Sequence, residues 1–212
     1  SSSNPRRRAC RAGTDRIRMY DISTGMIYDL APDAPPEANL RNPAIDGDLV
    51  AWQDARNGLD WDIWMNDTDP SRWEERQLIL DPAFQSFDQT NPGISGDLMV
   101  YEDSREGWTD IFLYNRSLSE ELGNLSPTDD GYSQQAPEIS GDRVIWQDAV
   151  GAQPGYYLIR MYNATTGGAY PPEYTDNAWD QSARISRNRL VWTEPGAETF
   201  HIYMYTTGAE RP

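Results

Sequence analysis

The residues best suited to chemistry are carboxylates that recur beside arginines at the same place in two segments. Asp54 stands two residues before Arg56, and Asp103 stands two residues before Arg105. Such pairs could form a charged rim that binds a ligand, or they could be ion pairs and turn-capping carboxylates that link neighbouring structural units. We favour the structural role, because a residue that repeats with a unit is best explained by the architecture of that unit.

A second group of carboxylates could bind a metal ion. Asp60 and Asp62 follow Asp54 closely, and Ca²⁺ prefers hard oxygen ligands. Their spacing differs from that of an EF-hand loop, so a calcium site stays open while solvated turn carboxylates are the simpler interpretation. One cysteine, Cys10, and one histidine, His201, are too few for a zinc site or an internal disulfide. We expect no other cofactor, and the role of Cys10 stays open.

Paired carboxylates can also hydrolyse glycosides, but that chemistry needs two unlike carboxyl groups at one site. The acidic residues here mostly repeat from segment to segment, which argues against a single tuned pair. No G-x-S-x-G segment is present, and the one histidine lies in a pattern typical of a strand. The sequence therefore predicts a protein that is not an enzyme.

Three tryptophans, Trp61, Trp108 and Trp179, fall in or near expected loops. Exposed aromatic rings can stack on sugars or anchor a protein interface. The alternative is that these rings pack between structural units. They are therefore the candidate ligand or interface residues.

The acceptor pattern for N-glycosylation outside the cell, N-x-S/T, occurs four times. Three of the four asparagines occupy equivalent places at the end of an expected strand. Asparagine also favours turns, so a structural explanation exists beside the chemical one. We expect at least one of the sites to carry a glycan. The acceptors are Asn66, Asn115, Asn124 and Asn163.

All of these residues lie in a repeated unit. Ile45, Ile94, Ile139 and Ile185 mark the same place in four aligned segments, at spacings of 49, 45 and 46 residues. A period of this length is typical of propeller blades or of helical arrays. Alternating side chains and tight-turn signals within each segment exclude the helical array and predict short antiparallel strands.

The fold class that follows is all-β: a β-propeller whose blades are four-stranded antiparallel sheets. We expect one propeller domain over residues 15–212, after an N-terminal arm over 1–14. Five blades are favoured over four. One blade is irregular, or is completed by a neighbouring chain or by the N-terminal strands, and we prefer ring closure by the N-terminal strands. The expected units are 42–88, 89–134, 135–181 and 182–210, with a partial blade over 15–40.

The second unit shows a spaced pattern that can be written Q-x-x-P-x-I-S-G-D followed by D-x-R-x-G-x-x-D-I. Its matching residues are Gln89, Pro92, Ile94, Ser95, Gly96, Asp97, Asp103, Arg105, Gly107, Asp110 and Ile111. In this pattern the chain resembles archaeal, methanogen-type cell-surface β-propeller repeat proteins, which are related to TolB-like propellers. The third unit departs from the pattern by inserting Gln153 and Pro154, and the fourth has Asn188 where aspartate is expected. The resemblance covers about residues 15–208 and implies an extracellular or cell-surface location with a binding or structural role.

The composition and net charge limit the classes of partner that the chain can bind. The formal net charge of -16 and the pI near 4.3 argue against nucleic acid and anionic membranes. No apolar run is long enough for membrane insertion. We therefore expect a non-catalytic extracellular structural or interaction protein, such as a self-associating, glycosylated subunit of a surface layer, sheath or filament. The alternative is a carbohydrate-binding, lectin-like module, and a glycosidase is the third interpretation.

Overall fold

The computed structural model describes residues 15–79, 81, 83–84, 86–126, 131–149, 157–170, 181–195 and 199–206. The expected N-terminal arm over 1–14, which includes Cys10, lies outside these residues. The described chain is all-β apart from a short 3-10 helix, η1 (Pro70–Arg72), and its strands form five separate antiparallel sheets. We number these sheets as blades 1 to 5 in chain order.

Among the described residues, the three middle blades contain four strands each, whereas blade 1 is a hairpin and blade 5 has three strands. The alternating segments therefore fold as short antiparallel strands, as expected. Blade 1 consists of β1 (Arg18–Asp21) and β2 (Met26–Asp29). Blade 2 consists of β3 (Leu40–Asp46), β4 (Leu49–Asp54), β5 (Asp62–Asp67) and β6 (Arg76–Gln77). Blade 3 consists of β7 (Gln89–Ser95), β8 (Leu98–Asp103), β9 (Asp110–Asn115) and β10 (Glu120–Asn124). Blade 4 consists of β11 (Gln134–Ser140), β12 (Arg143–Ala149), β13 (Tyr157–Asn163) and β14 (Gly168–Tyr170). Blade 5 consists of β15 (Gln181–Ser186), β16 (Arg189–Pro195) and β17 (Phe200–Thr206).

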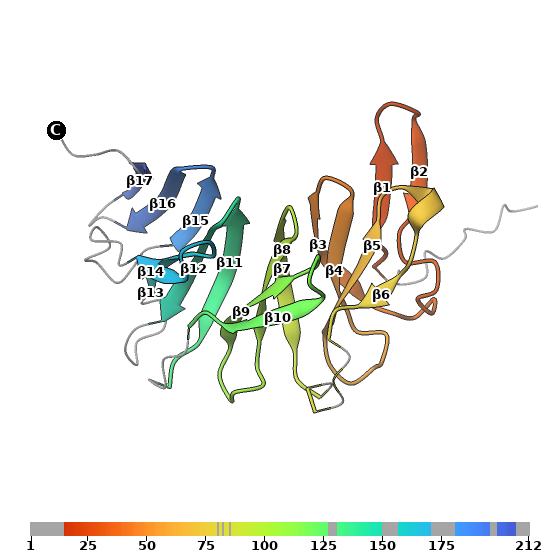
Figure 1. Cartoon of the computed structure of the whole chain (residues 1–212), viewed down its shortest axis with the longest axis horizontal. Helices are drawn as coiled ribbons and strands as arrows, with labels where there is room; N and C mark the ends of the chain where they lie inside the picture. The colour runs from red at the N-terminus through yellow and green to blue at the C-terminus, as the bar shows by residue number, and fades with distance from the viewer. Residues whose placement is uncertain are drawn as a thin grey trace, which may run out of the picture.

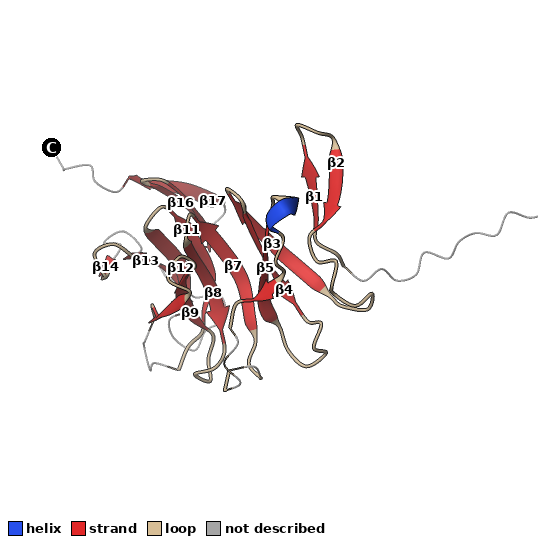
Figure 2. Ribbon diagram, turned by 45° about the vertical axis from the view of Figure 1, so that its right-hand side comes forward, coloured by secondary structure: helices blue, strands red, loops and turns tan. Residues whose placement is uncertain are grey.

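The blades stand side by side in an open arc (Figure 1, Figure 2). The hairpin of blade 1 lies at one end of the arc and β17 lies at the other. Within the part of the chain that the structure describes, β1 and β2 pair only with each other. The ring closure that we preferred from the sequence is therefore not seen. The packing explains the position of the hairpin, because Ile17 and Met19 belong to one apolar cluster with Val50 and Trp52 of blade 2.

Each blade has two apolar faces, because successive side chains of a strand point to opposite sides of the sheet. In blade 2, Ala51 and Met65 pack toward blade 3, whereas Val50 and Trp52 pack toward the hairpin. We call the side turned to the following blade the forward face and the opposite side the rear face. The forward face of one blade and the rear face of the next together bury an apolar cluster.

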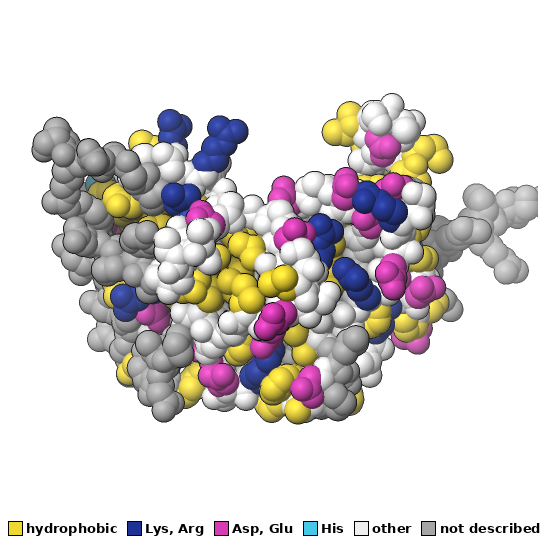
Figure 3. All heavy atoms as spheres, viewed as in Figure 1, with side chains coloured by type: hydrophobic (Ala, Val, Ile, Leu, Met, Phe, Trp, Pro, Cys, Tyr) yellow, Lys and Arg dark blue, Asp and Glu magenta, His cyan; other side chains and the backbone are white. Residues whose placement is uncertain are grey.

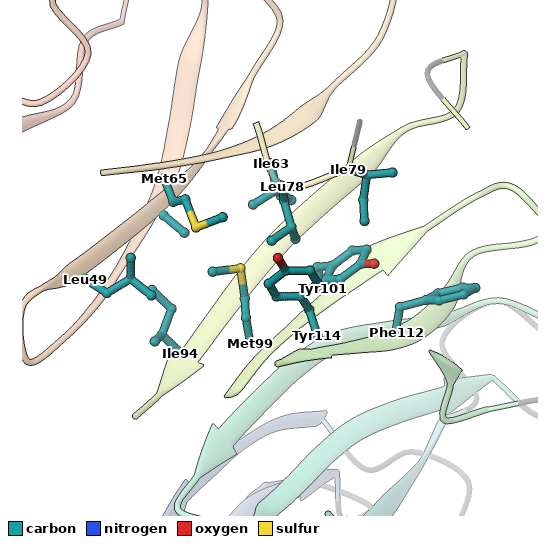
Figure 4. Close-up of a cluster of buried hydrophobic side chains, with 11 residues drawn as sticks. Leu49, Ile63, Met65, Leu78, Ile79, Ile94, Met99, Tyr101, Phe112 and Tyr114 are labelled. Atoms are coloured by element: carbon teal, nitrogen blue, oxygen red, sulfur yellow. The ribbon is translucent and has the colours of Figure 1, made fainter. Parts of the chain in front are cut away.

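The cluster between blades 2 and 3 is drawn in Figure 4, where side chains of both blades point toward one another. Burying a side chain of this size contributes about 1.5–3 kcal/mol, so these clusters hold the arc together. The forward face of blade 2 supplies Leu49, Ala51, Ile63, Met65, Leu78 and Ile79, and blade 3 supplies Ile94, Met99, Tyr101, Phe112 and Tyr114.

In blades 2 to 5 the first strand bends at a β-bulge, next to a residue with positive φ. The four residues, Asn42, Asn91, Ala136 and Ser182, have φ between 46° and 54°. Non-glycine residues seldom adopt this conformation, and a bulge re-aims a strand. At the bulges, neighbouring blades make polar contacts. Asn42 Nδ2 donates to Asn91 Oδ1 at 2.9 Å, and the N–H of Ala136 donates to Glu102 Oε1 at 2.7 Å.

Candidate functional site

The recurring aspartate of blade 2 is a buried turn cap. Asp54, which ends β4, is 0% exposed. Its Oδ1 accepts the backbone N–H of Arg56 at 2.8 Å, and its Oδ2 accepts Trp52 Nε1 at 3.0 Å and Arg56 Nη2 at 2.6 Å. Arg56 also donates to Glu75, and its guanidinium carbon lies 3.7 Å from the centroid of the Trp64 ring. The cluster thus ties the second strand to the start of the fourth within one blade.

Blade 3 repeats this cluster with an added contact to the segment before it. Asp103 is 0% exposed and accepts the backbone N–H of Arg105 at 2.8 Å. Arg105 Nη1 donates to Glu121 Oε1 at 2.9 Å. The guanidinium carbon lies 4.2 Å from the Phe84 ring centroid and 4.3 Å from that of Phe112. Phe84 precedes blade 3 and belongs to the neighbouring repeat unit. The contact between the two units is therefore made by stacking on Phe84, and the ion pairs of Arg105 stay within blade 3.

The buried phenol of Tyr101 completes the blade 3 cluster by donating a hydrogen bond to Glu121. Burial, together with the Glu121 carboxylate, raises the pKa of Tyr101 well above its ordinary value. The phenol therefore stays protonated and serves as a permanent donor to Glu121.

In blade 4 the recurring aspartate pairs with an arginine that the sequence analysis did not identify. Asp148 Oδ2 accepts Arg160 Nε at 2.7 Å, and its Oδ1 accepts Gln134 Nε2 at 3.1 Å. Arg160 lies on the third strand, β13, directly opposite Trp146 in register. Arg160 aligns in the sequence with Trp64 and Phe112, the rear-face residues on which Arg56 and Arg105 stack. This alignment is the signal that could have identified Arg160.

The three aspartates considered for calcium are not arranged as a ligand group. Asp54 is occupied by Arg56 and Trp52, Asp62 accepts hydrogen bonds from Asn57 Nδ2 at 3.0 Å and Gln77 Nε2 at 2.8 Å, and Asp60 accepts one from Asn57. Across the described residues, no group of three or more His, Cys, Asp or Glu side chains is placed to hold a metal ion. Burial raises the pKa of Asp62 to about 7, and the Asp60 and Asp54 carboxylates add to the effect.

The candidate tryptophans occupy different environments. Trp61 is half-buried, and the guanidinium carbon of Arg41 lies 5.3 Å from its ring centroid. Trp108 is 56% exposed in the loop between β8 and β9. Trp179 lies outside the described residues. Trp108 is therefore the described tryptophan of the three that is best placed to touch a ligand.

The four glycan acceptors also differ in access. Asn66 is 2% exposed and its Nδ2 donates to the Leu30 carbonyl at 3.0 Å, while Asn163 is 7% exposed and caps a turn. Asn115 and Asn124 are half-buried and accept backbone N–H groups of the residues that follow them. Glycosylation stays a prediction, and Asn115 and Asn124 are its more accessible acceptors.

A cleft of about 580 Å³ opens between the outer parts of blades 2 and 3. Apolar side chains, including Met65, Leu78 and Tyr114, form part of its wall. Its charged wall includes Arg105 and Glu121, which already pair with each other. Glu74, Arg76 and Asp81 also line the cleft, so its wall combines apolar and charged side chains.

No protein-family model matches the sequence, and no curated protein matches it. Solved structures do share its fold. TolB from Acinetobacter baumannii is 12% identical, with a TM-score of 0.59 over 91% of this chain and 46% of that chain. The β-propeller domain of the Trilobed protease from Pyrococcus furiosus is 13% identical, with a TM-score of 0.58 over 82% and 56%. Prolyl oligopeptidase B from Galerina marginata is 13% identical, with a TM-score of 0.66 over 98% and 30%.

These similarities show that the chain is an all-β protein with a β-propeller fold similar to that of TolB. The chain spans about half the length of the TolB chain and of the propeller domain that it matches. Sequence identities this low show a shared fold only, so any activity must be argued from the chain's own residues. Within the described part of the chain, no helix has the length and apolar character needed to cross a membrane.

Proposed function

We propose that this chain is a non-catalytic interaction module that acts outside the cell or at its surface by binding protein surfaces, copies of itself included. One observation carries the proposal. The repeated charged residues are turned inward and paired within the blades, whereas large apolar side chains stand exposed on the hairpin of blade 1 and on β17. Figure 3 shows hydrophobic side chains standing out on that hairpin.

A glycosidase would need two carboxyl groups that a sugar can reach. Asp54 and Asp103 are fully buried, and each is held by an arginine. Their burial and pairing favour a structural role over acid–base chemistry.

An extracellular location is supported by the resemblance of the repeats and by the half-buried acceptors Asn115 and Asn124. The acidic surface, with its net charge of -16, favours a solvated setting. A self-associating subunit of a surface layer, sheath or filament is the specific form of the proposal.

Sedimentation velocity of the purified chain over a wide range of concentration tests self-association. The expected result is an average mass that rises with protein concentration. A mass that stays at that of one chain throughout would contradict the self-associating form of the proposal.

The exposed Trp108 favours carbohydrate binding as a second candidate, because an accessible indole can stack on a sugar ring. A glycan array probed with the wild type and with Trp108→Ala tests it. Binding that the substitution removes would support a lectin-like role, and an array with no bound glycan would contradict it.

A further inference from the structure

The third strands of blades 2 to 5 and the segment that enters β1 in blade 1 share one sequence register, which makes residues of different blades comparable. The first and third positions of the register belong to the forward face, and the fourth belongs to the rear face. The five equivalent segments run over residues 17–20, 63–66, 111–114, 159–162 and 202–205.

One pairing recurs in the three clusters that join blades 2 to 5. A methionine or leucine at the third position of one blade shares a buried cluster with a tyrosine at the fourth position of the next blade. The pairs are Met65 with Tyr114, Leu113 with Tyr162, and Met161 with Tyr205. The three aliphatic partners are 2%, 1% and 4% exposed.

The two ends of the arc carry the separate halves of a fourth pair. Met204 occupies the third register position in blade 5 and is 66% exposed. Tyr20 occupies the fourth register position in blade 1 and is 60% exposed. Each half is extended by apolar neighbours. Ile202 is 79% exposed beside Met204, and Ile27, which lies directly opposite Tyr20 in the hairpin, is 63% exposed.

We propose that the forward face of blade 5 in one copy packs on the rear face of the β1–β2 hairpin in a second copy, with Met204 against Tyr20. A second copy is the occupant because this chain holds the complementary surface, and Figure 1 places the two elements that carry these surfaces, β17 and the β1–β2 hairpin, at opposite ends of one arc. The interface repeats the blade-to-blade contact that the chain already makes three times.

This interface joins unlike surfaces, so each added copy leaves one surface of each kind open. The assembly therefore grows head to tail, as an open filament or as a ring of several copies. The inference rests on the proposed self-association and identifies the surfaces that perform it.

Three arginine variants test the interface by sedimentation velocity, with circular dichroism to confirm that each remains β-structured. Met204→Arg and Tyr20→Arg place a charge in either half of the contact and should sediment as single chains. Leu118→Arg, on the exposed turn between β9 and β10, is the matched control and should associate like the wild type. An equimolar mixture of the two blocked variants should form a dimer and nothing larger, because each keeps one intact surface.

The outcomes separate this inference from the proposed function. Association that survives Met204→Arg would overturn the interface while self-association stands. A wild-type chain that is monomeric at every concentration would overturn both.

Disulfide trapping supplies a second readout that does not depend on a destabilising charge. In a Cys10→Ser background, a mixture of the Met204→Cys and Tyr20→Cys variants should form a covalent dimer on oxidation, and a mixture of Leu118→Cys with Tyr20→Cys should not. In the variant that carries both cysteines, a disulfide formed within one chain would show that the arc closes on itself, and would overturn the proposal.

Discussion

The hydroxyl oxygen of Ser95 in blade 3 accepts a hydrogen bond of 2.9 Å from the backbone N–H of Gly141 in blade 4. The same link joins blades 2 and 3, where Asp46 Oδ2 accepts the N–H of Gly96 at 2.6 Å. It joins blades 4 and 5 through Ser140 Oγ and the N–H of Arg187 at 2.7 Å. The residue before each tight turn therefore fastens its blade to the turn of the next blade.

Replacing Ser95 by alanine should lower the free energy of unfolding by about 1 kcal/mol, because the N–H of Gly141 loses its acceptor. Urea denaturation followed by tryptophan fluorescence measures the change. Ser186→Ala is the matched control, since Ser186 has the same place in blade 5 and no following turn lies against it among the described residues. Equal losses in the two variants would contradict the role of the link.

Arg105→Lys should destabilise the chain by about 2 kcal/mol, although it preserves the charge. Lysine lacks the planar group that pairs with Asp103 and Glu121 and lies over the rings of Phe84 and Phe112. Arg116→Lys is the control, because the Arg116–Asp97 pair lies at the surface, and its loss should stay below about 0.5 kcal/mol. Thermal and urea unfolding of both variants decide the comparison, and losses of the same size would refute it.

Asp62 should make the chain less stable as the pH rises from about 4 to about 7. Burial raises the pKa of this carboxyl from 3.8 to about 7, so in that range the folded state binds a proton that the unfolded state has lost. Above pH 7 both states are ionised, and the full cost of burying the charge is present.

Asp62→Asn should therefore raise the free energy of unfolding at pH 8, by an amount on the order of 1 kcal/mol, and flatten its dependence on pH. Urea midpoints measured between pH 5 and pH 8 provide the test. Asp33→Asn, at an exposed position, is the control. An Asp62→Asn variant whose pH profile matches the wild type would rule out this carboxyl as the source.

Expression in a host with N-glycosylation machinery should place glycans on Asn115 or Asn124 in preference to Asn66 and Asn163. The last two are 2% and 7% exposed, so their amides are enclosed in the fold. Mass spectrometry of tryptic peptides reads the four sites separately. Peptides unmodified at every site would end the glycosylation hypothesis, and modification of Asn66 in folded protein would contradict the role assigned to burial.

The repeat and its strands could be read from the sequence because both are local properties. Alternation in segments such as Arg143–Gln147 depends only on the two-residue period of a strand, and turn signals such as Asp46-Gly47 depend on one backbone conformation. The third strands β5, β9, β13 and β17 follow directly from these patterns.

Only the tertiary structure decided what each residue faces. Tyr20 and Tyr114 occupy the same register position, yet one is 60% exposed and the other 8%, because a preceding blade covers only the second. Likewise Arg160 reaches Asp148 across two paired strands, and the hairpin stays at the blade 2 end of an open arc. Burial and pairing depend on which elements become neighbours in space. Among the described residues, a middle blade has a neighbouring blade on both faces, whereas the same register positions at either end of the arc have a neighbour on one face only.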